Sequence, residues 1–446
     1  MTSAFLDEAC GALGESETVL EVAVCLLRFC RSNKVALAQM LRHSENREIV
    51  NAWVVAAEDR IKSLPPFVPV NVRQGFIDDL READDPVLVA RALVVAIDEY
   101  ASDMLRSDDL IESSHGALDR EEILVYPRGP IKKLYPPGVK FTTSYANRPN
   151  SYEVDRTPSL TIGVPSSLGF EIEIDRVSGQ YLDAAMRKFD TSTSLFGALV
   201  PSQTECEFDF PRLGDGYFGV RPKNENLQNE ILIQLLRLAG SRRVTICAAP
   251  ELSCFDSTLD KVLEIDSGEL PNIVYVGSVH KHCASKKVNR AYLVYPEYRH
   301  YLHHDKVSFF TERDGHERIQ EAIDLGGTIR FHWGRDWSMV ALTCADFLDP
   351  TVRKALAELR PSFIVVGAMS KKTDSFEAHA RELASAVQSH VLIVNGPRGW
   401  GDDVISGRPV VAMGAAPTNP VVTGRCAGDQ HAVAVLDDLN EVIWAV

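Results

Sequence analysis

The chain has 446 residues, and its 47 Lys and Arg against 62 Asp and Glu give a formal net charge of −15. Because phosphate backbones and anionic headgroups repel so acidic a chain, we expect neither nucleic-acid binding nor membrane-surface binding. Hydrophobic residues make up 45% and charged residues 24% of the sequence, which is typical of folded globular domains and argues against disordered or fibrous classes.

The ends and cysteines of the chain favour a cytoplasmic location. Residues 1–14 include Asp7 and Glu8 and no basic segment followed by an apolar one, so we expect no signal peptide. No run of about 18 uncharged apolar residues predicts a membrane span. The nine cysteines are irregularly spaced and include no Cys-x-x-Cys pair. A reduced, cytoplasmic protein fits this pattern best.

Residues 1–110 predict an all-α N-terminal domain. Thr18–Glu21 has the capping-box pattern that precedes a helix. Asp85 and Pro86 form a second helix start, and this helix is expected to continue to Leu105. Its segment 87–97 is apolar nearly all round, so either its own domain or a partner protein must bury it.

Residues 111–192 predict a Pro-rich linker with irregular β structure. Seven prolines occur between Pro127 and Pro165. The short apolar segments Leu160–Val164 and Phe170–Ile174 are interleaved with them and favour short strands.

Residues 193–446 predict an α/β domain, because apolar strand-like segments alternate with amphipathic helical ones. Expected strands lie at 197–200, 244–249, 272–276, 291–295, 339–343, 363–366 and 391–394, and expected helices at 226–238, 351–359 and 377–388.

Three reactive side chains follow expected strands in this domain. Glu251 comes after the strand at 244–249, Lys306 after a His-rich turn that follows 291–295, and Cys344 directly after 339–343. Functional residues of α/β sheets gather beyond the carboxyl ends of the strands. A thiol there is a candidate nucleophile, a carboxylate in an apolar setting a candidate base, and a lysine a candidate oxyanion stabiliser. Together they predict an acyl-transfer site that needs neither a metal nor a cofactor.

The sequence around these residues resembles the carbon–nitrogen hydrolase (nitrilase) superfamily over residues 196–446. The matching motifs follow one another in the order found in that superfamily, and are Gly197–Gln203, Val244–Glu251, Ile273–Ser278, Asn289–Val294, His303–Val307, Val340–Phe347 and Arg381–Asn395.

The resemblance implies a role for each site residue. Glu251 would be the general base, Lys306 the oxyanion stabiliser and Cys344 the nucleophile, with the backbone N–H of Ala345 completing the oxyanion hole. Glu312 matches a second glutamate found in many members. The small Ala345 after the nucleophile and the short interval from Glu251 to Lys306 depart from the usual pattern and leave the substrate open.

For the whole chain, the resemblance implies a nitrilase-like α-β-β-α sandwich preceded by the all-α domain and the linker. The implied activity is hydrolysis of a non-peptide C–N bond in a small-molecule amide, carbamoyl compound or nitrile, through a thioester on the cysteine. No cofactor is implied, and such domains form homo-oligomers. Two alternatives stay open: an N-acyltransferase with the same triad, and a regulatory module whose N-terminal helices dock a partner protein.

Histidines and cysteines also permit other kinds of site. A Cys–His protease would pair Cys344 with His379 or His390, although both histidines also fit simple packing roles. A metal site would draw on a group of possible ligands that lies in polar, basic loops, namely His280, His282, Cys283, His300, His303 and His304.

Overall fold

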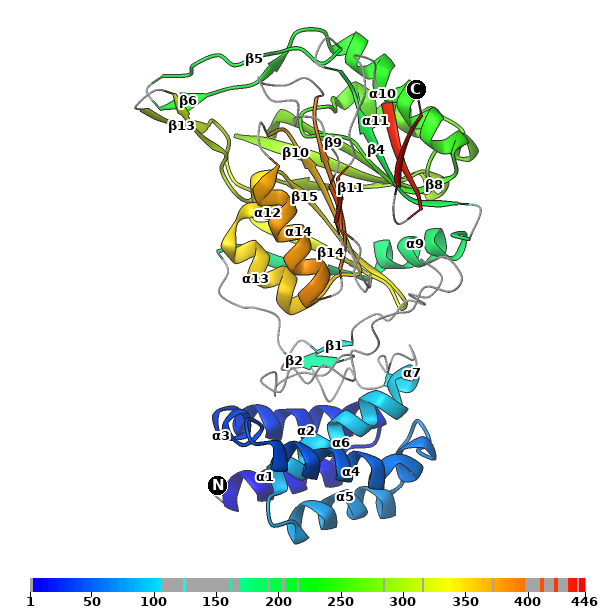
Figure 1. Ribbon diagram of the computed structural model, residues 1–446, viewed down its shortest axis with the longest axis vertical. Coiled ribbons are helices and arrows are strands. Elements are labelled where there is room, and N and C mark those ends of the chain that lie inside the picture. Colours follow the sequence, from blue (N-terminus) through cyan, green and yellow to red (C-terminus); the bar gives the residue numbers. More distant parts are fainter. Residues whose placement is uncertain are drawn as a thin grey trace. The chain divides into compact units, whose positions relative to one another are not determined.

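The computed structural model describes residues 3–105, 123–125, 160–162, 169–190 and 193–445, apart from gaps at 203–204, 215, 284, 315–316, 371–372, 388, 398–409, 413–420, 424–431 and 439–440. The chain divides into two compact units, which are Met1–Pro127 with Thr143–Val164, and Arg128–Thr142 with Pro165–Val446 (Figure 1). None of the helices in the described ranges has both the length and the apolar character needed to cross a membrane.

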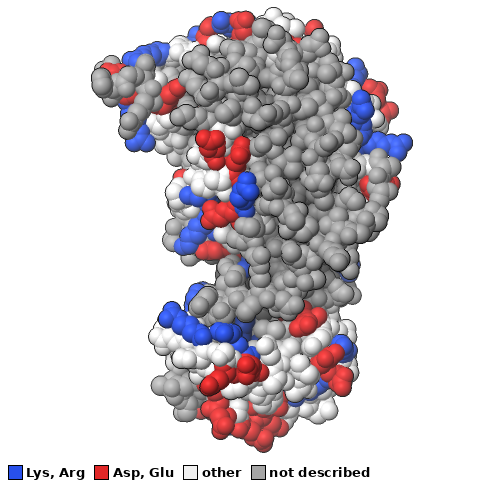
Figure 2. Space-filling view, in the orientation of Figure 1, with Lys and Arg blue, Asp and Glu red and all other residues white. Residues whose placement is uncertain are grey.

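The first unit is helical, as the sequence predicts. The Thr18 side chain accepts a hydrogen bond from the Glu21 backbone, and the Glu21 carboxylate accepts one from the Thr18 backbone, which confirms the capping box. Figure 2 shows Asp and Glu side chains gathered on part of this unit's surface. Its elements are α1 (Ser3–Glu15), α2 (Val19–Ser32), α3 (Lys34–Met40), α4 (Ser44–Lys62), α5 (Val70–Glu82), α6 (Pro86–Tyr100), α7 (Ser102–Leu105), β1 (Ile123–Val125) and β2 (Leu160–Ile162).

Helix α6 is the centre of this helical unit. Asp85 caps it by accepting hydrogen bonds from the Val87 and Leu88 backbone, and Pro86 occupies its first turn. The helix packs against α2, α4 and α5, and nearly all of its apolar side chains are buried. The apolar segment at 87–97 is therefore buried by its own unit.

The described part of the second unit contains two seven-stranded sheets. The first has the order β11 (His300–Asp305), β10 (Lys286–Tyr295), β9 (Ile273–Cys283), β8 (Val244–Ala248), β4 (Ser194–Val200), β20 (Ala432–Asp438) and β21 (Glu441–Ala445). The second has the order β19 (Val421–Thr423), β18 (Val410–Ala412), β17 (His390–Asn395), β16 (Phe363–Ala368), β15 (Ser338–Thr343), β14 (Thr328–Trp333) and β3 (Glu171–Asp175).

The two sheets pack face to face between layers of helices. One apolar core joins side chains of both sheets, including Phe196, Leu293 and Phe363. Helices α10 (Glu225–Ser241) and α11 (Asp256–Glu264) cover the outer face of the first sheet through a second core. On the other side lie α12 (Ala345–Leu348), α13 (Pro350–Leu359) and α14 (Asp374–Ala386), of which α14 contacts β17 and β18 (Figure 1). The α-β-β-α sandwich predicted from the sequence is confirmed.

The structure differs from the sequence prediction at the start of this unit. Strand β3 runs parallel to β14, and α9 (Arg176–Arg187) buries Leu182 and Met186 in the core between the sheets. Residues 171–187 thus belong to the sandwich, although the sequence analysis assigned them to the linker. The expected strand at 170–174 is present as β3. The rest of the expected linker lies outside the described residues, except 123–125, 160–162 and 169–190.

A small extension of the second unit carries one residue of the site described below. It contains two short sheets and an aromatic cluster that includes Phe208, Phe218 and Phe310. Its strands are β5 (Phe208–Asp209), β6 (Tyr217–Phe218), β7 (Arg221–Pro222), β12 (Thr311–Asp314) and β13 (Glu317–Glu321).

Two buried histidines make the stability of the second unit depend on pH. Burial lowers the pKa of His332 to about 3 and that of His390 to about 4. Below about pH 6.5 the unfolded chain takes up protons on these rings and the folded chain does not. The free energy of unfolding therefore decreases as the pH decreases. Between about pH 6.5 and pH 5 we expect each histidine to lower the free energy of unfolding by about 1.5 kcal/mol.

Urea unfolding at these two pH values measures this effect. His390→Phe is expected to remove about half of the pH-dependent loss that the two rings cause. The exposed His282 on β9 provides a control, since His282→Phe should leave the pH dependence unchanged. A wild-type-like loss in the His390 variant would show that the buried ring does not contribute.

Candidate active site

Glu251, Lys306 and Cys344 meet in one buried cluster, as their positions after strands predict. Their side chains come from the ends of β8, β11 and β15, and the residues are 5%, 1% and 2% exposed. The Lys306 Nζ lies 2.8 Å from Glu251 Oε1, and the Glu251 carboxylate also hydrogen-bonds the Cys344 thiol. The structure therefore brings together three residues that are far apart in the sequence.

Two glycines allow the turn with Glu251 to sit against the neighbouring strands. Gly277 on β9 has φ +90°, and a Cβ there would collide with the Pro250 carbonyl and the Ser253 hydroxyl. A Cβ at Gly367 on β16 would lie 2.8 Å from the Ala249 carbonyl oxygen. Larger residues at either place would push Glu251 away from Lys306 and Cys344.

Cys344 occupies a strained backbone conformation. Its φ of 46° and ψ of −104° lie in a region that residues other than glycine rarely adopt, at a cost on the order of 1–3 kcal/mol. The conformation turns the chain sharply from β15 into α12, while the Cys344 N–H donates to the Gly367 carbonyl at 2.9 Å. The Met369 backbone N–H donates to the sulfur. Such strain is typical of functional positions.

The second carboxylate beside Lys306 is Glu321, and this corrects the assignment to Glu312. Lys306 Nζ donates to Glu321 Oε2 at 2.7 Å, and Glu321 is 3% exposed. Glu312 is half-buried on β12, where it pairs with Ile319 in the β12–β13 hairpin. The hairpin returns the chain toward the site, so the glutamate at its far end reaches the lysine.

Two further side chains complete the cluster, and the sequence analysis gave neither of them this role. Asn289 on β10 donates from Nδ2 to Oε1 of both Glu251 and Glu321, each at 2.9 Å. His280 on β9 hydrogen-bonds Glu321 Oε1 through Nε2 at 2.8 Å. Both lie on strands whose other residues are largely apolar, and a polar residue within a buried strand is the signal that identifies them.

Burial and neighbouring charges shift the pKa values of the four groups of the cluster in different directions. Burial and the nearby Glu321 raise the pKa of Glu251, although Lys306 opposes them. Burial also acts to raise the pKa of Glu321, but Lys306 and His280 hold it well below its usual value. Burial lowers the pKa of Lys306, yet the two carboxylates keep it well above normal. Burial and Glu251 raise the pKa of the Cys344 thiol. These shifts favour the charged forms of Lys306 and Glu321, and they favour the protonated forms of Glu251 and of the Cys344 thiol beside it.

Asp346 fastens the lysine segment to the cysteine turn. Its carboxylate accepts hydrogen bonds from the backbones of Val307 and Ser308 at 2.9 and 2.8 Å, and from the Thr343 backbone at 3.3 Å. Val307 and Ser308 donate to Oδ1, whereas Thr343 donates to Oδ2, from which His304 Nε2 lies 2.7 Å. The fully buried Asp346 therefore contacts residues next to both Lys306 and Cys344.

Asp346→Asn is expected to destabilise the protein by roughly 2–3 kcal/mol, because an amide nitrogen cannot accept the hydrogen bonds that one carboxylate oxygen receives. Urea unfolding measures this loss. Asp349→Asn is a matched control, because Asp349 only caps α13 and asparagine caps helices equally well. Equal stability of the two variants would contradict the fastening role of Asp346.

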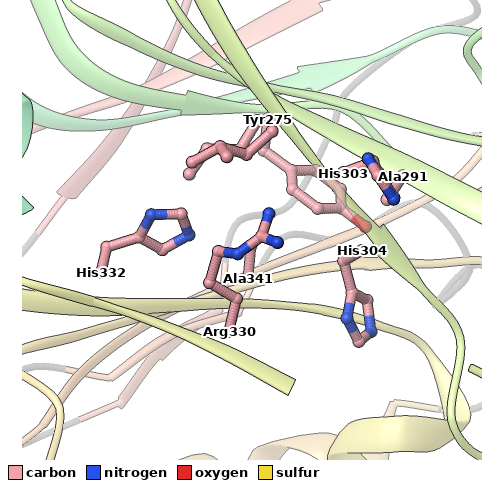
Figure 3. A pocket seen from close by; sticks show the side chains of 9 residues that line it. Tyr275, Ala291, His303, His304, Arg330, His332 and Ala341 are labelled. Atoms are coloured by element: carbon pink, nitrogen blue, oxygen red, sulfur yellow. The ribbon is translucent and has the colours of Figure 1, made fainter. Parts of the chain in front are cut away.

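A small cavity of mixed polar and apolar lining lies between strands of the two sheets (Figure 3). Its volume is about 10 Å³, close to the space of one water molecule. Tyr275, His303, His304, Arg330 and His332 line it together with apolar side chains. The Tyr275 hydroxyl donates to the Leu342 carbonyl at 3.0 Å, so the cavity reaches the strand that precedes Cys344.

The other site types considered from the sequence are arranged differently. His390 begins β17, whereas Cys344 follows the opposite end of the parallel strand β15. His379 hydrogen-bonds Arg353 on α13. Within the described part of the chain, no group of three or more His, Cys, Asp or Glu side chains is placed to hold a metal ion.

Fold and site together define an α-β-β-α sandwich with a buried Glu–Lys–Cys cluster. No protein-family model and no curated protein matches the sequence. Among solved structures, a CN-hydrolase superfamily protein from Xanthomonas campestris is similar to this chain, with 16% identity over 54% of this chain and 89% of that one (TM-score 0.37). An amidase from Nesterenkonia sp. shows 14% identity over 55% and 92% (TM-score 0.38).

A glutamine-dependent NAD+ synthetase from Acinetobacter baumannii is also similar, with 12% identity over 54% of this chain and a TM-score of 0.38. The chain spans only 45% of that synthetase.

Proposed function

We propose that this protein is a cysteine-dependent hydrolase of non-peptide C–N bonds, with small-molecule amides as its substrates. The observation that carries the proposal is that the Glu251 carboxylate bonds both the Lys306 ammonium, at 2.8 Å, and the Cys344 thiol inside a buried cluster. Burying charged groups is costly, and a module that only binds a partner has no need of them beside a strained cysteine.

Acylation begins when the Glu251 carboxylate takes the proton of the Cys344 thiol. The thiolate attacks the amide carbonyl carbon, and the C=O electron pair moves onto oxygen. Lys306 donates two N–H bonds to carboxylates, which leaves its third for this oxyanion. The Ala345 N–H, in the first turn of α12, is the second donor, and each good donor contributes on the order of 3 kcal/mol. The C–N bond then breaks, and Glu251 returns its proton to the departing amine.

Deacylation repeats this sequence with water. Glu251 takes a proton from a water molecule, whose oxygen attacks the thioester carbonyl. The C–S bond breaks, the carboxylic acid leaves, and the Cys344 sulfur recovers the proton held by Glu251. The net reaction consumes one amide and one water and yields one acid and one amine, and every step uses groups of this chain.

Incubation with a pool of simple amides tests the proposal. We expect release of ammonia and the matching acids, and formation of hydroxamates when hydroxylamine is added, because hydroxylamine competes with water for a thioester. Acyl transfer to an added amine at the expense of acid would show an N-acyltransferase instead. If the pool yields neither ammonia nor an acylated Cys344, the proposed chemistry is wrong.

A further inference from the structure

His280 lies against the side of Glu321 that faces away from the lysine. The two side chains are 6% and 3% exposed, and the His280 Nε2 lies 2.8 Å from Glu321 Oε1, whereas Lys306 binds Oε2. A carboxylate oxygen only accepts hydrogen bonds here, so the Nε2 carries the hydrogen. Among the described residues, none hydrogen-bonds the buried Nδ1 of this ring. Glu321 is therefore the group that this histidine serves.

The donors around the two carboxylates are unequal. Lys306 and Asn289 each donate to both Glu251 and Glu321, so they favour neither. Glu321 additionally accepts from His280, and at 3.4 Å from the Phe310 backbone. Glu251 in turn accepts from the Cys344 thiol. His280 is thus the side chain that donates to Glu321 and not to Glu251.

This difference decides which carboxyl carries a proton. Two carboxylates that share one ammonium cannot both ionise freely, and they titrate as a pair. A hydrogen bond to the charged form favours ionisation of the group that accepts it. Another nearby charged group is Lys287 on β10, whose pKa is lowered by burial and by Arg221, while Glu321 opposes this shift.

We propose that His280 is a positioning residue that keeps Glu321 ionised and thereby leaves Glu251 as the carboxyl that exchanges a proton with Cys344. The proposal rests on the proposed function, since it assigns a proton path to the same site. It adds that a residue of β9 other than Glu251, Lys306 and Cys344 determines which of the two glutamates exchanges the proton.

The pH profile of Cys344 alkylation by iodoacetamide, followed by peptide mass mapping, tests this without knowledge of the substrate. In the wild type, alkylation slows at low pH as the carboxylate pair takes up a proton. His280→Leu removes a donor from Glu321, so the pair binds that proton more readily, and the acid limb should move up by about one pH unit. His280→Gln keeps an N–H donor, so its acid limb should lie close to that of the wild type.

Three controls separate this role from a structural one. His282→Leu changes an exposed histidine two residues along β9 and should leave the profile unchanged. In a Glu321→Gln background, His280→Leu should add no further shift, because the carboxylate it serves is gone. If His280→Leu fails to fold, His280→Asn, which is too short to reach Glu321, carries the same prediction.

The outcomes distinguish the two proposals. If alkylation of Cys344 depends on Glu251 but His280→Leu retains the wild-type acid limb, the role of His280 is wrong and the proposed function stands. If Glu251→Gln alkylates as the wild type does at every pH, no proton passes between Glu251 and Cys344, and both proposals are overturned.

Discussion

Cys344→Ala is expected to lower the rate of amide hydrolysis by roughly 10⁴-fold or more, because no other group of the cluster can form the thioester. Glu251→Gln should cost about 10³-fold, since a neutral amide can neither take the thiol proton nor return it to the amine. Initial rates of ammonia release from the best amide of the pool measure both losses.

Cys283 provides the control for this experiment. It lies half-buried at the end of β9 and has no part in the cluster, so Cys283→Ala should hydrolyse the amide at the wild-type rate. Since Glu251 and Cys344 act as one unit, the double variant should be little worse than Cys344→Ala alone. Substantial hydrolysis by Cys344→Ala would show that another nucleophile does the chemistry.

Lys306→Met is expected to destabilise the protein by about 3–5 kcal/mol at neutral pH, because it leaves Glu251 and Glu321 buried without their counter-charge. Their pKa values in the folded variant should then rise above that of an exposed glutamate. A raised carboxyl pKa means that folding favours the protonated form, so the deficit should be smallest in acid and grow as the pH rises. Urea unfolding at several pH values measures this dependence.

Lys354→Met is the matched control for the lysine variant. Lys354 on α13 is 67% exposed and lies 3.9 Å from Glu358. Losing such a surface pair should change the free energy of unfolding by less than about 1 kcal/mol at any pH. If Lys306→Met were equally mild, or if its deficit grew in acid, the buried charge balance described for the site would be wrong.

The main residues of the site could be found from the sequence because of how parallel strands are arranged. β8, β9 and β4 run parallel, as do β15, β16 and β17, so their carboxyl ends meet at shared edges. Glu251 and Cys344 follow two such ends. Their places after apolar segments mark them as candidates, and the ordered motifs that resemble the carbon–nitrogen hydrolase superfamily join them into one predicted site.

The residues that were missed depend on contacts that no local pattern encodes. Glu321 reaches Lys306 only because the β12–β13 hairpin folds back, whereas Glu312 lay closer along the chain. Asn289 and His280 face each other because the β9–β10 hairpin sets their register. Hairpin register follows from turn geometry and packing over the whole sheet, and a strand-by-strand search cannot supply it.

The boundary before the sandwich was missed for a related reason. β3 is a short edge strand of alternating charge, EIEID, and its residues are half exposed. Such a strand carries little apolar signal, and its place beside β14 depends on residues more than 150 positions later, such as Thr328, which pairs with Glu171. The buried central strands were clear from the sequence because their apolar runs are continuous.

Formation of an acyl-enzyme on Cys344 is the most direct test of the proposed chemistry. Wild-type protein mixed with p-nitrophenyl acetate and quenched rapidly with acid should carry one acetyl group on the peptide that contains Cys344. Hydroxylamine should remove this group, because it cleaves thioesters but leaves acetylated lysines intact. Hydroxylamine-resistant acetylation alone, on lysines or the N-terminus, with p-nitrophenol still released catalytically, would contradict a thioester mechanism at this site.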